Sequence, residues 1–368
     1  MKIQIPRQDL LDAVNKAKSV VSSKSALPIL SHLLMESGES AIKISATDLK
    51  VSIECNADCN VEEPGSLTVS SQRLASILSE LPEADIVMEL AESNVIKLSC
   101  GRIQTKLFSM SPDEFPPIRS FEGVEPLVLQ QSVLKKLFVG TSFAICPDQA
   151  RYNLTGLLFE AAGGALTVVG TDGRRMSLCR ETEGVAESAE LKVIIPGKMI
   201  SELEHLLGDD GEVSVFIDEN QAGFALENVR VVTALIEGNF PNYDMVVPKK
   251  HNKEALTNTV QFLEAIRRTR TMTNDKFNSV RLFLSKGLLA LRVVTPEVGE
   301  YEEELSVEYE GEPVEIAFNP DFVLDVVRHI ESEMTCIVLK DSGSPGLLKP
   351  YTESPVDSYL NVIMPIRI

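Results

Sequence analysis

The sequence predicts an α+β protein in which three similar domains follow one another, each with two helices packed on antiparallel sheet. Three observations support this fold class: an internal repeat of about 124 residues, two helical apolar stripes in each repeat, and alternating strand-like segments between them. The chain has 368 residues, which is long enough for two or three domains of ordinary size.

The repeat is visible as short matching segments at a nearly constant spacing. The matching segments are Thr47-Asp48, Thr171-Asp172 and Thr295-Pro296, together with Phe115-Pro116, Phe240-Pro241 and Met364-Pro365. Leu30 to Glu36 also aligns with Leu154 to Glu160. Proline and polar residues cluster at 112–126 and 241–253, as is typical of domain joints. We therefore expect domains at residues 1–122, 123–249 and 250–368, each close to the commonest domain size.

Each repeat is expected to contain two helices. The first helices are predicted at residues 8–21, 131–145 and 258–272, and the second at 71–81, 197–207 and 320–331. Leu10, Val14, Ala17 and Val21 recur at helical spacing and define one apolar face. Such stripes are expected to face the core, and none of them indicates a cofactor site.

Strands are expected in the remaining segments, where apolar residues alternate between turn residues, as from Val229 to Thr233. Asp172-Gly173 lies between two such runs and predicts a hairpin, because both residues tolerate a positive φ. Two interpretations of Asp172-Gly173-Arg174-Arg175 remain open at this point: a polar hairpin turn or a grip for a phosphate.

The charge of the chain is strongly negative overall but unevenly distributed. The formal net charge is −19, which by itself argues against tight binding to phosphates. The windows 7–24, 131–151 and 258–276, which contain the first helices, nevertheless each carry a net charge of +2. These charges are either ordinary solvated helix faces or a surface that attracts a polyanion weakly. Weak, diffuse attraction suits sliding along DNA, and no set of base-reading side chains is evident.

Motifs of catalysis are absent from the sequence. It contains no phosphate-binding loop, no dinucleotide-binding glycine motif, no nucleophile elbow and no zinc-binding HExxH helix. The six cysteines and four histidines form no metal-ligand pattern, so no catalytic residue, metal or cofactor is expected. Scattered cysteines and the lack of an apolar run of about 18 residues favour a cytoplasmic protein with no membrane span.

The glutamate-rich run 297–315 is either a solvated loop or half of an electrostatic interface.

Taken in order along the chain, the motifs resemble those of a known family, the bacterial sliding clamp (beta subunit of the replicative DNA polymerase III). The matching segments are Leu27-Pro28-Ile29-Leu30, Thr47-Asp48-Leu49, Arg151-Tyr152-Asn153-Leu154-Thr155-Gly156, Thr171-Asp172-Gly173-Arg174-Arg175-Met176, Phe240-Pro241-Asn242-Tyr243, Asn274-Asp275-Lys276-Phe277 and Val362 to Ile368. They cover the chain from end to end, including its three-domain periodicity.

The resemblance implies three tandem domains of the DNA clamp fold, assembled head to tail into a dimeric ring around duplex DNA. It implies a processivity factor without turnover, which an ATP-dependent clamp loader places on DNA. The ring would tether the polymerase catalytic subunit and other proteins with clamp-binding motifs. Their short peptides would bind in a groove between the second and third domains.

The resemblance also assigns site residues. It places in the peptide groove Leu154, Thr171, Gly173, Arg174, Arg175, Met176, Pro241, Val246, Phe322, Val362, Met364, Pro365 and Arg367. It places Lys24 and Lys198 near DNA, and Leu107 and Met272 in the apolar centre of the dimer interface. In that interface Arg73 and Arg102 would face Glu297 and Glu303 of the other copy. Arg174, Met245 and Phe322 depart from residues common in the family.

Two rival functions remain to be weighed against the clamp. One is a non-enzymatic scaffold of repeated domains that assembles by its edges without encircling DNA. The other is a hydrolase that uses Asp172 and acidic neighbours with a metal, which the missing ligand set disfavours.

Overall fold

The computed structural model describes residues 1–21, 27–91, 94–248, 253–352 and 358–367. The chain divides into two compact units. Unit 1 contains Met1–Ser132 and Ser201–Leu235, and unit 2 contains Val133–Ile200 and Ile236–Ile368. The second repeat therefore contributes residues to both units. No helix in the described ranges is long and apolar enough to cross a membrane.

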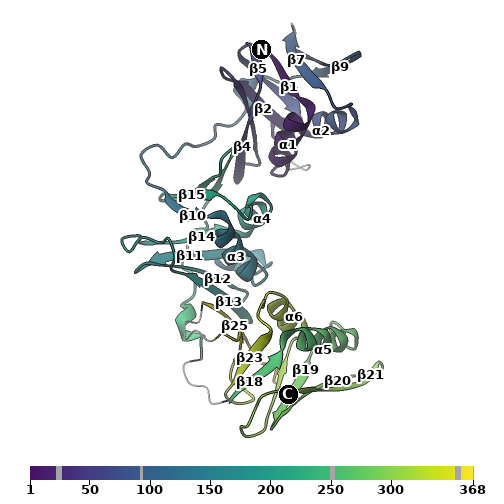
Figure 1. Ribbon diagram of the computed structural model, residues 1–368, viewed down its shortest axis with the longest axis vertical. Helices are drawn as coiled ribbons and strands as arrows, with labels where there is room; N and C mark the ends of the chain where they lie inside the picture. Colours follow the sequence, from purple (N-terminus) through teal and green to yellow (C-terminus); the bar gives the residue numbers. More distant parts are fainter. Residues whose placement is uncertain (22–26, 92–93, 249–252, 353–357, 368) are drawn as a thin grey trace. The chain divides into compact units, whose positions relative to one another are not determined.

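Unit 1 contains two antiparallel sheets (Figure 1). The first has the order β5 (Asn60–Glu63), β1 (Lys2–Pro6), β7 (Asp85–Ala91), β8 (Val95–Cys100) and β9 (Ile103–Phe108). The second has the order β10 (Leu127–Gln130), β15 (Glu212–Ile217), β16 (Gln221–Ala225), β17 (Val229–Ala234), β4 (Val51–Asp58), β3 (Ala41–Thr47), β2 (His32–Ser37) and β6 (Gly65–Ser70). Helices α1 (Arg7–Lys18) and α2 (Ser71–Glu80) pack beside each other, and α1 also lies against β4.

Unit 2 repeats this plan with two further antiparallel sheets. The larger has the order β14 (Leu191–Pro196), β11 (Gly156–Ala162), β12 (Ala165–Thr171), β13 (Arg175–Glu181), β25 (Tyr359–Ile363), β24 (Gly346–Pro350), β23 (Met334–Leu339) and β18 (Lys253–Asn258). The smaller has the order β21 (Gly299–Ser306), β20 (Leu288–Thr295), β19 (Val280–Ser285) and β22 (Val314–Phe318). Helices α5 (Thr259–Thr271) and α6 (Pro320–Arg328) pack beside each other (Figure 1).

The remaining helices belong to the second repeat or to connections. They are α3 (Gln131–Ser142), α4 (Gly197–Leu206) and the short 3-10 helices η1 (Pro28–Ser31), η3 (Pro112–Glu114), η4 (Gln149–Leu154) and η5 (Tyr243–Met245). All six predicted helices are thus confirmed, with ends shifted by a few residues. In the first of them Val20 is fully buried and Val21 only partly, contrary to the predicted stripe. The reason is that α1 already ends at Lys18, so helical spacing no longer applies there.

Neighbouring repeats share sheets, which the sequence pattern did not predict. Strand β4 of the first repeat pairs with β17 of the second, and β13 of the second pairs with β25 of the third. Each large sheet is therefore continuous across two repeats. Pairing satisfies backbone N–H and C=O groups that an exposed strand edge would leave open, which explains why neighbouring repeats join in this way.

The cores come from the apolar stripes that the sequence shows. In unit 2, Phe262 and Ile266 of α5 and Val323 and Val327 of α6 are buried in one cluster with strands of the smaller sheet. Asparagines fix the starts of both helices. The Asn258 side chain accepts a hydrogen bond from Gln261 N, and the Asn319 side chain accepts one from Asp321 N.

Candidate functional site

The hairpin between β12 and β13 is stabilised by hydrogen bonds from side chains within its turn. Asp172 Oδ1 accepts hydrogen bonds from the backbone N–H groups of Arg174 (2.8 Å) and Arg175 (3.0 Å). Thr171 Oγ1 donates to the carbonyl of Arg175 at 2.6 Å, and Gly173 takes a φ of 80°, which glycine adopts without strain. The predicted hairpin turn at Asp172-Gly173 is confirmed.

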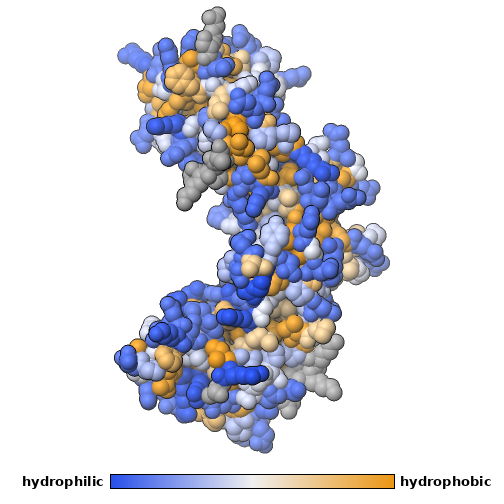
Figure 2. Space-filling view, turned by 180° about the vertical axis from the view of Figure 1, so that it is seen from behind, coloured by the Kyte–Doolittle hydropathy of each residue, from blue (hydrophilic) through white to orange (hydrophobic). Residues whose placement is uncertain are grey.

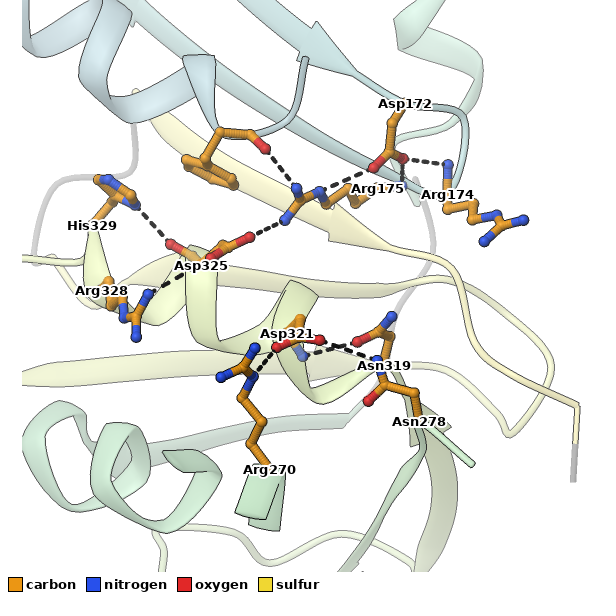
Figure 3. Close-up of polar contacts among 11 residues, drawn as sticks. Asp172, Arg174, Arg175, Arg270, Asn278, Asn319, Asp321, Asp325, Arg328 and His329 are labelled. Carbon is orange, nitrogen blue, oxygen red and sulfur yellow. Dashed lines mark hydrogen bonds and ion pairs between the residues drawn. The ribbon is translucent and has the colours of Figure 1, made fainter. Parts of the chain in front are cut away.

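Arg175 is the centre of a polar cluster that joins the second and third repeats (Figure 3). Its Nε donates to Asp172 Oδ2 at 3.1 Å, and its Nη1 donates to Asp325 Oδ2 on α6 at 2.6 Å. Its Nη2 donates to the carbonyl of Phe143, and the guanidinium carbon lies 4.6 Å from the ring centre of Phe322. The Arg175 side chain is only 11% exposed. Two carboxylates and an aromatic face offset the cost of placing this cation away from water.

Helix α6 carries a second polar cluster one turn before Asp325 (Figure 3). Asp321 is paired with Arg270 of α5 and accepts a hydrogen bond from Asn278 Nδ2 at 3.0 Å. Asp321 and Asp325 are four residues apart, so they lie on the same side of the helix. One helix therefore holds the hairpin through Asp325 and the end of α5 through Asp321.

The end of the chain is held next to the hairpin. In the pairing of β13 with β25, Arg175 lies opposite Ile363, and Met176 lies opposite Val362. The backbone N–H of Met364 then donates to the carbonyl of Arg174 at 2.9 Å. Met176 and Val362 are buried, whereas Met364 is 42% exposed. The residue that follows the strand, Met364, thus presents an apolar side chain to solvent beside the turn.

Two connecting segments approach the same region. Arg151 in η4 donates to the carbonyl of Asp172, and η4 ends at the buried Leu154. Tyr243 belongs to the buried cluster that contains Met176 and Val362, and its carbonyl accepts a hydrogen bond from Val246 N at 3.0 Å. Val246 and the neighbouring Met245 are exposed. The space-filling view in Figure 2 shows a mostly hydrophilic face on which hydrophobic residues form separate patches.

These contacts bring most of the expected groove residues into one region of unit 2. Asn153 in η4 donates a hydrogen bond from Nδ2 to the carbonyl of Asn239. The exposed Pro241 follows Asn239 by two residues in the segment that η4 binds in this way. Pro365 is half-buried, and Arg367 and Gly173 are exposed. Sequence reasoning missed Asp325 and Phe143, and it named Tyr243 only as part of a matching motif. Each of the three acts on residues far away along the chain, so local patterns do not reveal these contacts.

The Tyr243 side chain is anchored by an ionic network. Its hydroxyl donates to Glu160 Oε2 at 2.6 Å, and Lys192 pairs with Glu160 Oε1 at 2.6 Å. Burial alone would raise the pKa of Glu160, but hydrogen bonds from Lys192 and Tyr243 outweigh it and leave the pKa below its ordinary value. The pKa of Tyr243 is raised by burial and by the same carboxylate.

Most residues expected at a dimer interface lie on or next to two unpaired sheet edges, β9 in unit 1 and β21 in unit 2, whereas Arg73 lies on α2. Arg73 and Arg102 are exposed, and Leu107 and Met272 are half-buried. Glu297 is exposed, with a φ of 67°. Glu303 is already bound within its own chain, because Arg268 donates two hydrogen bonds to it (2.6 and 3.0 Å) and holds its pKa below the ordinary value.

The residues expected near DNA are only partly described. Lys198 is exposed at the start of α4, whereas Lys24 lies outside the described residues. The first helices expose Lys16, Lys136 and Arg267. Within the described ranges, no group of three or more His, Cys, Asp or Glu residues is placed to hold a metal.

Fold and site together define a class of protein: a tandem array of α+β domains that share sheets and meet at an arginine-centred joint next to exposed apolar side chains. Family models match almost the whole chain. They are described as the N-terminal, central and C-terminal domains of the DNA polymerase III beta subunit and match residues 1–119, 128–242 and 244–367. The chain belongs to this family, and its function is that of a sliding clamp.

Curated relatives and solved structures agree with this assignment. The beta sliding clamp of Chlamydia muridarum is 32% identical over 368 residues, which cover 100% of this chain and 99% of the relative. A clamp structure from Pseudomonas aeruginosa bound to griselimycin has a TM-score of 0.95 at 32% identity and full coverage of both chains. A clamp structure from Bacillus subtilis has a TM-score of 0.96 at 25% identity, covering 100% of this chain and 99% of the other. The expected family and three-domain clamp fold are confirmed, and a scaffold unrelated to DNA is not favoured.

Proposed function

We propose that two copies of the chain close head to tail into a ring around duplex DNA and hold partner proteins there without catalysing a reaction. Domains 1–122, 123–249 and 250–368 would be the repeating parts of this ring. An ATP-dependent loader would open it, and the ring would act on DNA in the cytoplasm. The polymerase catalytic subunit and other proteins would bind through short peptides.

The observation that carries the peptide-binding proposal is the joint around Arg175. It fixes three elements relative to one another: the hairpin, α6 and the end of β25. Exposed Met364 is bound to Arg174 beside this joint, and exposed Met245 and Val246 follow Tyr243, which is buried with Met176 and Val362. Methionine side chains adapt to different apolar partners, which suits a site with several ligands. Burial of one or two apolar side chains contributes about 1.5–3 kcal/mol each before ordering costs, so isolated peptides should bind with roughly micromolar affinity.

The charges on the two unpaired sheet edges, β21 and β9, support the ring proposal. The outward-facing side chains of β21 include Glu300, Glu302 and Glu304, whereas the edge near β9 carries Arg102 and Lys106. Opposite charge on two unpaired edges favours pairing between copies and disfavours pairing of like edges. Because Arg268 already binds Glu303 and Arg292 already binds Glu302, we expect Glu297, Glu300 and Glu304 to meet the partner's arginines first.

Deletion of Met364 to Ile368 tests the peptide site. Strand β25 ends at Ile363 and should stay paired, so the ring should keep its dimer mass. Binding of polymerase and of apolar peptides should be lost, as measured by polymerase stimulation and fluorescence anisotropy. The variant Met364→Glu leaves the backbone intact and should weaken the same binding. Normal stimulation by the truncated ring would show that the peptides bind elsewhere.

A further inference from the structure

The segment 240–247, which leads from the second repeat to the third, is anchored to the larger sheet of unit 2 by several of its side chains. Tyr243 is buried in one cluster with Met176 and Val362. Phe240 and Val247 pack against the same cluster and are partly buried. The segment therefore lies on the sheet face that carries two of the expected groove residues.

Between these anchors the segment presents two apolar side chains to solvent. The 3-10 helix η5 begins at Tyr243, whose carbonyl accepts a hydrogen bond from Val246 N at 3.0 Å. Met245 is 80% exposed, and Val246 is 37% exposed. The position of Tyr243 therefore fixes the backbone that carries both exposed side chains.

The acceptor of the Tyr243 hydroxyl is itself held in place by the sheet. Glu160 on β11, which accepts this hydrogen bond at 2.6 Å, lies directly opposite Lys192 on β14. Lys192 binds the other carboxylate oxygen at 2.6 Å. On its other side Glu160 lies opposite Thr167 of β12, whose Oγ1 accepts a hydrogen bond from Arg180 Nε at 3.2 Å. Strand register and the lysine thus fix the carboxylate that the tyrosine reaches.

We propose that Tyr243 is a positioning residue of the peptide site: its hydrogen bond to Glu160 keeps Met245 and Val246 in the arrangement that binds apolar peptides. This inference rests on the proposed peptide-binding function and adds a residue that acts through the turn it begins. A wall that is in place before a peptide arrives saves the cost of ordering it during binding. Without the hydroxyl the competent arrangement is less populated, and the apparent affinity falls by the same fraction.

Tyr243→Phe in the full-length protein tests the inference, with a labelled synthetic peptide that contains one leucine and phenylalanine pair. Fluorescence anisotropy should show binding that is about three- to tenfold weaker, as expected for the loss of one hydrogen bond to a charged group. In stopped-flow measurements the association rate should fall and the dissociation rate should stay nearly unchanged, because the wall must be ordered before the peptide can bind. The matched control is Tyr309→Phe. Tyr309 is buried in the cluster around the smaller sheet, and its hydroxyl donates to the carbonyl of Glu312 at 2.6 Å.

Substitution of the carboxylate shows whether the tyrosine acts through it. Glu160→Gln keeps an acceptor oxygen and should bind the peptide more tightly than Glu160→Ala. Adding Tyr243→Phe to Glu160→Ala should weaken binding little further, because both changes remove the same hydrogen bond.

The outcomes separate this inference from the peptide site itself. If Tyr243→Phe binds the peptide as tightly as the unmodified protein, or if Tyr309→Phe weakens binding equally, Tyr243 does not position the wall and the inference is wrong, although the peptide site stands. Additive losses in the double variant would also overturn the inference. If the unmodified protein binds no peptide, the peptide site is wrong and the inference fails with it.

Discussion

At the scale of single residues, the joint between the second and third repeats depends on carboxylates that hold an arginine in place. Asp325 is the partner of Arg175 that comes from the third repeat, so it is the side chain that ties α6 to the hairpin. Asp325→Asn should lower the free energy of unfolding by roughly 1–2 kcal/mol, because it weakens a charged hydrogen bond to a largely buried cation. Urea unfolding measures this, and Asp275→Asn, at an exposed position, should have little effect. If Asp325→Asn unfolds at the same urea concentration as the unmodified protein, the pair Arg175 and Asp325 does not stabilise the joint.

Tyr243 offers a residue-scale test that depends on pH. Its hydrogen bond helps to keep the folded-state pKa of Glu160 below the ordinary value of 4.5. This contribution to stability is therefore present above that ordinary value and lost as the pH falls through the lower folded-state pKa. Tyr243→Phe keeps the packing but should reduce stability at pH 7 more than at pH 3, as followed by thermal unfolding. An equal loss at both pH values would show that the hydroxyl does not stabilise the ionised carboxylate.

At the scale of secondary-structure elements, α5 ends next to the free edge strand β21. Met272 follows α5 directly, and its carbonyl accepts a hydrogen bond from Thr295 Oγ1 at 2.5 Å. Met272→Glu would bury an unpaired carboxylate in the proposed dimer interface, at a cost of several kcal/mol. We expect dimer mass to fall to monomer mass in sedimentation, whereas Val260→Glu, exposed at the other end of α5, should stay dimeric. A Met272→Glu dimer at nanomolar concentration would place the interface elsewhere.

The same scale shows what the sequence could and could not predict. Helices and the Asp172-Gly173 turn depend on residues within a few positions of one another, so their patterns are local and were predicted. Shared sheets depend on which strand edges meet, as for β4 with β17, and alternation alone does not encode that choice. The pair Arg175 and Asp325 spans 150 residues, so its geometry required the fold. The groove residues were assigned from the family resemblance and not from the periodicity of the sequence.

At the scale of the whole molecule, a chain with a strongly negative net charge must work on DNA, which is itself a polyanion. A net charge of −19 leaves little attraction for phosphates, even with positive charge on the first helices. A ring resolves this conflict, because a closed ring stays on DNA by encircling it and not by affinity. Weak contacts then become an advantage, since they let the ring move along the duplex.

Retention on circular DNA tests the ring most directly. The protein is loaded onto a nicked circular plasmid by a clamp loader and followed by gel filtration in low and high salt. The account predicts that the protein stays on the closed circle in salt that abolishes binding to short linear duplexes. It also predicts that the protein is released when one cut makes the circle linear. Equal sensitivity to salt on the two substrates, or retention after the cut, would contradict encirclement.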